Sequence, residues 1–230
     1  MSLKPEFDAH ASNYQVQLDK QLKFFGAESK KYARRKALLI KDAVNEQEQN
    51  IYNILDFGCG TGVMTSELYS LFPNANIFGT DPSSKSLEIA IENSNPDINY
   101  LAPQALYKRR LQFNLIVAAN VFHHIPFVEH LEQLKNLKKH LITGGYFFFF
   151  EHNPFNPLAR MIVRQCELDK NAKLLAPNYT KWLFNCSGFS DNTLFYYLFF
   201  PPISNITNKI ESYLKWLPLG AQYCMLSKKQ

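Results

Sequence analysis

The chain has 230 residues, enough for one α/β domain with a small appendage but few for two independent domains. Its formal net charge of +5 is modest and its basic residues are mostly interspersed with acidic ones, so a nucleic-acid partner is not indicated. The longest apolar runs, 146–150 and 194–203, are shorter than the roughly 18 residues that suggest a membrane-spanning helix, so no transmembrane segment is expected.

The cysteines and the N-terminal sequence favour a cytoplasmic setting. The four cysteines are far apart and show no C-x-x-C spacing for a metal or redox pair. The first residues lack the apolar core of a signal peptide. A reducing compartment is the simplest environment for such a chain.

The first half of the chain is predicted to contain two helices followed by alternating strands and helices. Apolar residues recur at helical spacing from Phe7 to about Val44, with a break at Gly26. Pro82 is suited to the first turn of a helix. The expected elements are strands at 51–56, 76–80 and 98–101 and helices at 62–72 and 82–92, with a brief helix after the third strand.

The second half continues the alternation and closes with strands around a helix. Residues 113–119 form an uninterrupted apolar run, which is typical of a parallel strand covered on both faces. Thr143, Gly144 and Gly145 suggest a turn between a helix after Pro126 and a fifth strand. The remaining expected elements are a strand at 146–150, a helix from Pro177 to Gly188, a strand at 193–200, a helix at 206–217 and a strand at 222–227.

This alternation predicts a doubly wound, mostly parallel sheet with right-handed crossovers. Ligands of such sheets bind beyond the carboxyl ends of the strands, where the strand order reverses. The expected fold is therefore α/β and Rossmann-like.

The most informative stretch is 51–64, where an apolar run stops at Asp56, turns through Gly58, Gly60 and Gly62 and then becomes helical. Glycine permits positive φ and close backbone approach to a ligand. A dinucleotide fingerprint has the spacing G-x-G-x-x-G, whereas this loop reads G-x-G-x-G and has an acidic residue just before the first glycine. The spacing favours a nucleoside-containing cofactor other than a dinucleotide.

Asp81 follows the second strand, where α/β nucleotide sites place an acidic residue against the ribose hydroxyls. A carboxylate can accept hydrogen bonds from both hydroxyls. The alternative is a helix N-cap, because Asp81 and Pro82 could simply begin the next helix. The glycine loop upstream favours ribose binding.

Two motifs carry a family resemblance. The segment Leu55-Asp56-Phe57-Gly58-Cys59-Gly60-Thr61-Gly62 resembles the first motif of class I S-adenosylmethionine (SAM) methyltransferases. Residues 119–126, Ala-Asn-Val-Phe-His-His-Ile-Pro, are similar to the fourth motif of that family. The resemblance implies a seven-stranded sheet with an antiparallel C-terminal hairpin, SAM as the cofactor, and methyl transfer to a small-molecule acceptor.

The resemblance also implies which residues hold the cofactor. After the third strand the usual acidic adenine contact is missing, and Gln104 is the only side chain offered there. Residues 7–14 resemble a segment that folds over the cofactor, with His10 and Tyr14 on one helix face, although simple packing on the sheet is an alternative. The implied cofactor residues are Tyr14, Asp56, Gly58, Cys59, Gly60, Gly62, Asp81, Pro82, Gln104, Ala105 and Asn120.

The expected organisation is a single methyltransferase domain over 1–230, with an N-terminal helical lid at 1–46 and an acceptor-side insertion at 151–190. The Glu-His-Asn-Pro-x-Asn-Pro segment from Glu151 and residues 217–223 resemble a narrower bacterial group. We associate that group loosely with glycan or envelope metabolism. Methylation at oxygen or nitrogen is expected.

Three residues near the strand ends are candidate catalytic residues: Glu151, His152 and His123. A general base is needed only if the acceptor must lose a proton, and histidine is suited to this near neutral pH. A loop-structuring role for each histidine is the alternative. No metal is expected, because these residues and His124 lack a recognised ligand spacing.

Arg160 and Arg164 would lie one turn apart on a helix and could hold a phosphate or carboxylate of the acceptor. Pairing with Glu167 and Asp169 is the alternative. The aromatic segment 195–202 invites peripheral membrane contact, but a buried strand is favoured.

Other functions are less favoured by the motifs. A nucleic-acid methyltransferase that acts on base amines would carry an Asn-Pro-Pro-Tyr type of motif after the fourth strand, and the chain has Asn-Val-Phe-His there. A SAM-binding protein without turnover would show an eroded loop, and a nicotinamide-dependent enzyme a different glycine spacing. The oligomeric state is left open.

Overall fold

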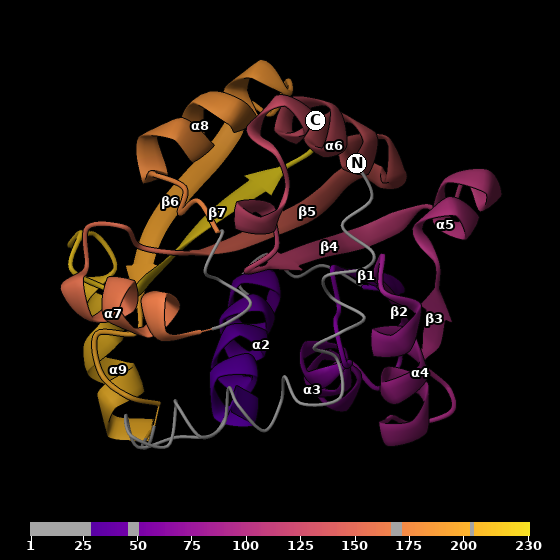
Figure 1. Ribbon diagram of the computed structural model, residues 1–230, viewed down its shortest axis with the longest axis horizontal. Helices are drawn as coiled ribbons and strands as arrows, with labels where there is room; N and C mark the ends of the chain where they lie inside the picture. The colour runs from indigo at the N-terminus through magenta and orange to yellow at the C-terminus, as the bar shows by residue number, and fades with distance from the viewer. Residues whose placement is uncertain (1–28, 46–50, 167–171, 203–204) are drawn as a thin grey trace. The chain divides into compact units, whose positions relative to one another are not determined.

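The computed structural model describes residues 29–45, 51–166, 172–202 and 205–230 (Figure 1). The strands are β1 Asn53–Phe57, β2 Asn76–Thr80, β3 Asn99–Leu101, β4 Phe113–Ala119, β5 Leu141–His152, β6 Asp191–Tyr197 and β7 Gln222–Lys228. The helices are α2 Ser29–Asn45, α3 Val63–Leu71, α4 Ser84–Asn93, α5 Pro103–Arg109, α6 Phe127–His140, α7 Pro157–Gln165, α8 Pro177–Cys186 and α9 Asn205–Leu214, with a 3₁₀ turn at Phe122–His124.

The seven strands form one sheet in the order β3-β2-β1-β4-β5-β7-β6. The numbers descend to β1 and ascend from β4, which is the doubly wound pattern. Strands β1, β2 and β3 are parallel to one another, whereas β7 is antiparallel to both β5 and β6. The expected fold is confirmed: a mostly parallel α/β sheet with an antiparallel C-terminal hairpin.

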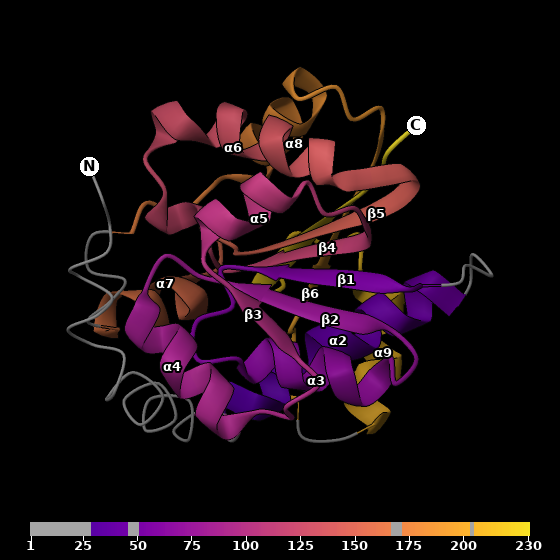
Figure 2. The ribbon, with the colours of Figure 1, turned by 90° about the vertical axis from the view of Figure 1, so that its right-hand side faces the viewer.

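The chain divides into two compact units, residues 1–115 and 116–230. In the first unit, helices α2, α3 and α4 lie on one side of β1–β3 and α5 lies on the other (Figure 2). The apolar side chains of β1 and of the helices beside it are buried, with Ile40, Ile54, Leu55 and Leu68 fully so. The buried strand β1 ends at Phe57, and the glycine loop follows directly from Gly58.

The second unit is built on the aromatic run of β5. Phe147 to Phe150 are fully buried, and Phe184 of α8 contacts Phe147 and Phe149 edge-on, with ring centroids 5.6 and 5.4 Å away. Helices α6 and α8 lie on one side of β5–β7 and α9 lies on the other (Figures 1 and 2). No helix within the described residues is long and apolar enough to cross a bilayer.

Strand β5 corrects the expectation of a turn at Thr143-Gly144-Gly145, because it runs from Leu141 to His152. Gly144 has φ of 80°, and its N–H donates to the carbonyl of Lys229 at 2.7 Å. The N–H of Lys229 donates in return to Gly145 at 2.9 Å. The glycines kink a strand that stays paired with the end of the chain, so they do not terminate it.

The start of α4 corrects a second expectation. Pro82 is not in the first turn, because the N-cap is Ser83, whose hydroxyl accepts from the N–H of Ser86 at 3.1 Å. A serine hydroxyl satisfies one of the open N–H groups of the first turn and competes well for this position. The carboxylate of Asp81 is therefore not the helix cap.

Candidate functional site

The glycine loop is fixed to the end of β2 by two backbone hydrogen bonds. The N–H groups of Gly58 and Cys59 both donate to the carbonyl of Thr80, at 2.8 and 3.0 Å. Gly58, Gly60 and Gly62 have φ of 74°, 52° and 80°, a region that side-chain-bearing residues rarely adopt. The glycine spacing seen in the sequence is thus required by the backbone of the loop.

Asp81 joins β2 to the centre of this loop. Its Oδ2 accepts from the N–H of Gly60 at 2.9 Å, and its Oδ1 accepts from the N–H of Ser83 at 2.9 Å. Each carboxylate oxygen has two acceptor sites, so these two bonds do not exhaust its capacity. The acidic residue and the glycine loop, separate in sequence, form one hydrogen-bonded arrangement.

Asp56 is buried at the end of β1, and its Oδ2 accepts from the hydroxyl of Thr65 at 2.6 Å. Burial raises the pKa of Asp56 to about 7, and the charge of Asp81 acts in the same direction. The hydrogen bond from Thr65 and the charge of Lys36 act against this rise. The carboxyl therefore titrates close to neutral pH.

We expect this raised pKa to make the folded state less stable as pH rises. The protonated carboxyl favours the folded chain, so its contribution is complete below the ordinary pKa of 3.8 and is lost as pH rises to about 7. In chemical denaturation between pH 4 and 8, the unfolding free energy of the wild type should fall relative to that of Asp56→Asn. Parallel curves for the two proteins would contradict the assignment.

Tyr100 of β3 packs against Gly62 of the glycine loop and Gly79 of β2, a contact that sequence patterns do not reveal. A Cβ atom on Gly79 would lie 2.7 Å from two atoms of the Tyr100 ring, and one on Gly62 would collide with its hydroxyl. That hydroxyl hydrogen-bonds to Ser94 at 2.7 Å, and burial raises the pKa of Tyr100 to about 12. Two glycines thus leave the space that the tyrosine fills.

The first unit has features that fit a nucleoside cofactor. A Cβ atom on Gly60 would meet no atom within 4 Å, so the backbone is open on that side. The hydroxyl of Thr80 is buried and has no hydrogen-bond partner in the described part of the chain. This arrangement suits a ligand with ribose hydroxyls, because it combines the open backbone at Gly60, the carboxylate of Asp81 and the hydroxyl of Thr80.

The other expected cofactor residues are distributed more widely. Pro82 and Gln104 are exposed, Gln104 and Ala105 in the first turns of α5. Tyr14, and most of the proposed lid at 1–46, lie outside the described residues. Asn120, in the second unit, has φ of 59° and a buried Oδ1 for which the described residues supply no hydrogen-bond partner.

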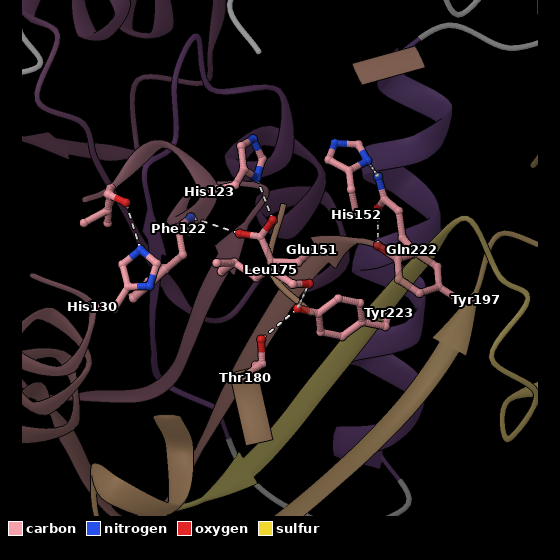
Figure 3. Close-up of polar contacts among 11 residues, drawn as sticks. Phe122, His123, His130, Glu151, His152, Leu175, Thr180, Tyr197, Gln222 and Tyr223 are labelled. Atoms are coloured by element: carbon pink, nitrogen blue, oxygen red, sulfur yellow. Dashed lines mark hydrogen bonds and ion pairs between the residues drawn. The ribbon is translucent and has the colours of Figure 1, made fainter. Parts of the chain in front are cut away.

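Two of the three catalytic candidates, His123 and Glu151, form a buried hydrogen-bonded pair (Figure 3). His123 Nδ1 lies 2.6 Å from Glu151 Oε2, and both side chains are about 1 % exposed. The other carboxylate oxygen accepts from the N–H of Phe122 at 3.0 Å. The 3₁₀ turn after β4 thus presents a histidine and a backbone donor to one carboxylate at the end of β5.

Burial by itself would raise the pKa of Glu151, but its surroundings lower it below the ordinary value. The charge of His123 and the hydrogen bond from its ring act first, and His152 and His124 add to them. Glu151 therefore stays ionised and accepts hydrogen bonds from both partners. The ring centroids of His123 and His124 are 4.2 Å apart, and the ring of His123 hydrogen-bonds to Glu151.

His152 has a different partner. Its Nδ1 lies 3.3 Å from Nε2 of Gln222, and the hydroxyl of Tyr197 donates to Oε1 of the same amide. Next along the chain, the side-chain amide of Asn153 donates to the carbonyls of Gly220 and Pro218, at 2.8 and 3.1 Å. The segment after β5 and the segment before β7 are therefore hydrogen-bonded to each other.

Helix α7 confirms that Arg160 and Arg164 lie one turn apart. They line a hollow of about 440 Å³ together with Met161, and both guanidinium groups are on exposed residues. Glu167 and Asp169, proposed as their alternative partners, lie outside the described residues. Within the described ranges, no group of three His, Cys, Asp or Glu side chains could hold a metal.

Fold and loop together define the class: a Rossmann-like nucleotide-binding domain closed by an antiparallel hairpin. A family model described as a methyltransferase domain matches residues 10–191. The chain therefore belongs to the methyltransferase-domain family, and the class I methyltransferase resemblance seen in the sequence is confirmed at the level of the family.

Individual relatives agree with this family. A malonyl-[acyl-carrier protein] O-methyltransferase of Bacillus cereus is 29% identical over 149 residues, which are 63% of this chain and 53% of the relative. This chain spans about half the length of the curated relatives it matches. These relatives therefore support membership of the methyltransferase family.

Solved structures agree with the fold. The plantazolicin methyltransferase BpumL, solved with S-adenosylhomocysteine (SAH) and a monoazolic desmethylPZN analog, has a TM-score of 0.67 at 14% identity, and the match covers 98% of this chain and all of that one. A SAM-dependent methyltransferase from Archaeoglobus fulgidus has a TM-score of 0.59 at 18% identity, covering 84% of this chain and 94% of its own. At these identities the likeness shows the fold alone.

Proposed function

We propose that this chain transfers a methyl group from SAM to an oxygen of a small organic acid. The observation that carries the proposal is the hydrogen bond between Gly60 and Asp81, which ties the glycine loop to the carboxylate expected to hold a ribose. SAM supplies an electrophilic methyl group on a sulfonium, so the protein has mainly to align the acceptor and exclude water.

The first unit would bind the cofactor. Asp81 would accept hydrogen bonds from the ribose hydroxyls, and the open backbone at Gly60 would allow close approach of the methionine part. Asp56 would counter the positive charge of the methionine ammonium in its ionised form. Tyr14, Gln104 and Ala105 stay predicted contacts of this unit, and Asn120, which belongs to the second unit, stays a separate prediction.

The second unit would supply the proton acceptor. Glu151 accepts from Nδ1 of His123, so the neutral ring has its lone pair on Nε2. A hydroxyl acceptor would give its proton to this Nε2 as its oxygen attacks the methyl group. Glu151 does not take the proton; it orients the imidazole and stabilises the positive charge that develops on it.

An acidic acceptor is supported from two directions. The Bacillus cereus relative acts, by its name, on an oxygen of a malonyl group. In this chain Arg160 and Arg164 line a hollow beside an apolar Met161, an arrangement that suits a carboxylate or phosphate attached to a carbon chain. Glycan- or envelope-related acids belong to the same chemical class and stay candidates.

The experiment is a calorimetric titration of SAH followed by transfer of labelled methyl groups from SAM. The acceptor panel should contain dicarboxylic acids, hydroxy acids, sugar acids, amines and RNA. Micromolar SAH binding with transfer to an acid supports the proposal. Transfer to RNA alone would establish the nucleic-acid alternative, SAH binding without any transfer would leave a binding protein, and no SAH binding would overturn the cofactor assignment.

A further inference from the structure

In two histidines of the second unit, the ring atom Nδ1 faces different kinds of hydrogen-bond partner: an acceptor in one and a donor in the other. Nδ1 of His123 faces a carboxylate oxygen of Glu151, whereas Nδ1 of His152 faces the amide nitrogen of Gln222. The two ring centroids are 5.5 Å apart. In Figure 3 the second nitrogen of each ring points away from these partners.

The partner of each Nδ1 decides which ring nitrogen carries the hydrogen. An ionised carboxylate only accepts hydrogen bonds, so Nδ1 of His123 must carry a hydrogen. For Gln222, the hydroxyl of Tyr197 donates to Oε1, which leaves the N–H of Nε2 directed at His152. Nδ1 of His152 must then accept, and its hydrogen lies on Nε2.

Strand pairing holds the second arrangement in place. Gln222 of β7 is the register partner of His152 on β5 and of Tyr197 on β6, so the three residues form one row across the sheet. Gln222 and Tyr197 are buried, at 6% and 1% exposure. A row of this kind keeps the amide from rotating freely.

Gly220 packs closely against Tyr197, the last residue of β6 and a member of this row. A Cβ atom on Gly220 would lie 2.5 Å from the carbonyl oxygen and 2.8 Å from the nitrogen of Tyr197, so the close contact requires glycine. The carbonyl of Gly220 is in turn held by the side chain of Asn153 at 2.8 Å. The backbone of Tyr197 therefore packs closely against Gly220, which the side chain of Asn153 holds in place.

We propose that Gln222 and Tyr197 are positioning residues that make His152 a hydrogen-bond donor through Nε2, beside the proton-accepting Nε2 of His123. This role rests on the proposed function. The pair suits an acceptor in which the reacting O–H lies next to a second oxygen, as in a hydroxy acid: one ring takes the proton while the other donates to the neighbouring oxygen. An isolated alcohol or amine uses only the first ring.

The test is the nitrogen chemical shifts of the two imidazoles in ¹⁵N-histidine-labelled full-length protein, assigned with His152→Asn. We expect His123 to show a hydrogen on Nδ1 and His152 a hydrogen on Nε2. In Gln222→Glu the residue at the same place only accepts, so His152 should move its hydrogen to Nδ1 or become doubly protonated. Wild-type His152 with its hydrogen on Nδ1, or an unchanged spectrum in Gln222→Glu, overturns the proposal.

Two further variants separate positioning from simple structural damage. Tyr197→Phe removes the hydroxyl that orients the amide of Gln222. It should give a mixture of the two His152 tautomers while the fold stays that of the wild type. Asn185→Asp, an exposed amide-to-acid change in the same unit, should leave both spectra unaltered. These spectra need neither cofactor nor acceptor, so they stand even if no methyl transfer is found.

A kinetic readout follows where the acceptor panel yields a hydroxy acid substrate. Gln222→Glu should then raise its KM about tenfold or more, with a smaller change in kcat, because the lost hydrogen bond orients the bound acceptor. An equal effect on a matched alcohol lacking the second oxygen would contradict the assigned role.

Discussion

Asp81→Ala is expected to weaken SAH binding at least tenfold, a loss of about 1.4 kcal/mol. The substitution removes the carboxylate proposed for the ribose hydroxyls and also the acceptor of the Gly60 N–H at 2.9 Å. The loop would lose the hydrogen bond at Gly60 as well as its ligand contact, while the two backbone hydrogen bonds to Thr80 stay in place. Calorimetric titration of wild type and variant measures the effect directly.

Asp97→Ala is the matched control for Asp81, because Asp97 is an exposed carboxylate of the same unit, where it accepts from the hydroxyl of Tyr69. It should bind SAH as the wild type does. Thermal unfolding without ligand shows whether Asp81→Ala still folds, and Asp81→Asn, which keeps one acceptor oxygen, serves if it does not. A folded Asp81 variant with wild-type affinity would remove this residue from the cofactor site.

Glu151→Gln is expected to lower kcat about 100-fold or more while SAH affinity stays unchanged. The amide cannot accept from both Phe122 N–H and His123 Nδ1 as the carboxylate does, at 3.0 and 2.6 Å. If its NH₂ group faces the ring, Nδ1 must accept and the hydrogen moves to Nε2, which ends the ability of His123 to take a proton. The variant keeps the size of the side chain, so the fold should survive.

The rate of methyl transfer against pH distinguishes this mechanism from damage. The wild-type rate on a hydroxyl acceptor should rise as His123 loses its proton, and Glu151→Gln should lose that limb of the profile. Glu132→Gln, the same change on the exposed face of α6, should leave rate and profile alone. A Glu151→Gln enzyme with normal kcat would assign the ion pair to structure.

The breaking of this ion pair has a further consequence for stability. Removal of one partner from a buried pair leaves an uncompensated charge and typically costs about 3–5 kcal/mol. His123→Leu should therefore be much less stable than the wild type, because it leaves the ionised carboxylate of Glu151 buried without the ring that donates to it. Glu151→Gln instead removes the buried charge itself, which is why the isosteric amide is used for the kinetic test.

Local sequence patterns, such as apolar runs and glycine spacing, predicted much of the fold. Strands β2 and β4 have the bounds expected from apolar runs, 76–80 and 113–119. The glycine loop was readable because its conformation demands residues without a side chain at three nearby positions. Ser83 was missed as the cap of α4, because Asp81, Pro82 and Ser83 all suit a helix start and only the tertiary contact of Asp81 with Gly60 decides among them.

The sequence by itself determined the alternation of strands and helices, the glycine loop and the acidic residue after the second strand, since each depends on neighbouring residues and their backbone preferences. Only the tertiary structure decided which side chains meet. His123 and Glu151 are 28 residues apart, and Gln222 reaches His152 from 70 residues away. Strand register sets the second of these contacts, and register follows from the burial of one face of each strand against the rest of the molecule, which the residues around His152 alone do not reveal.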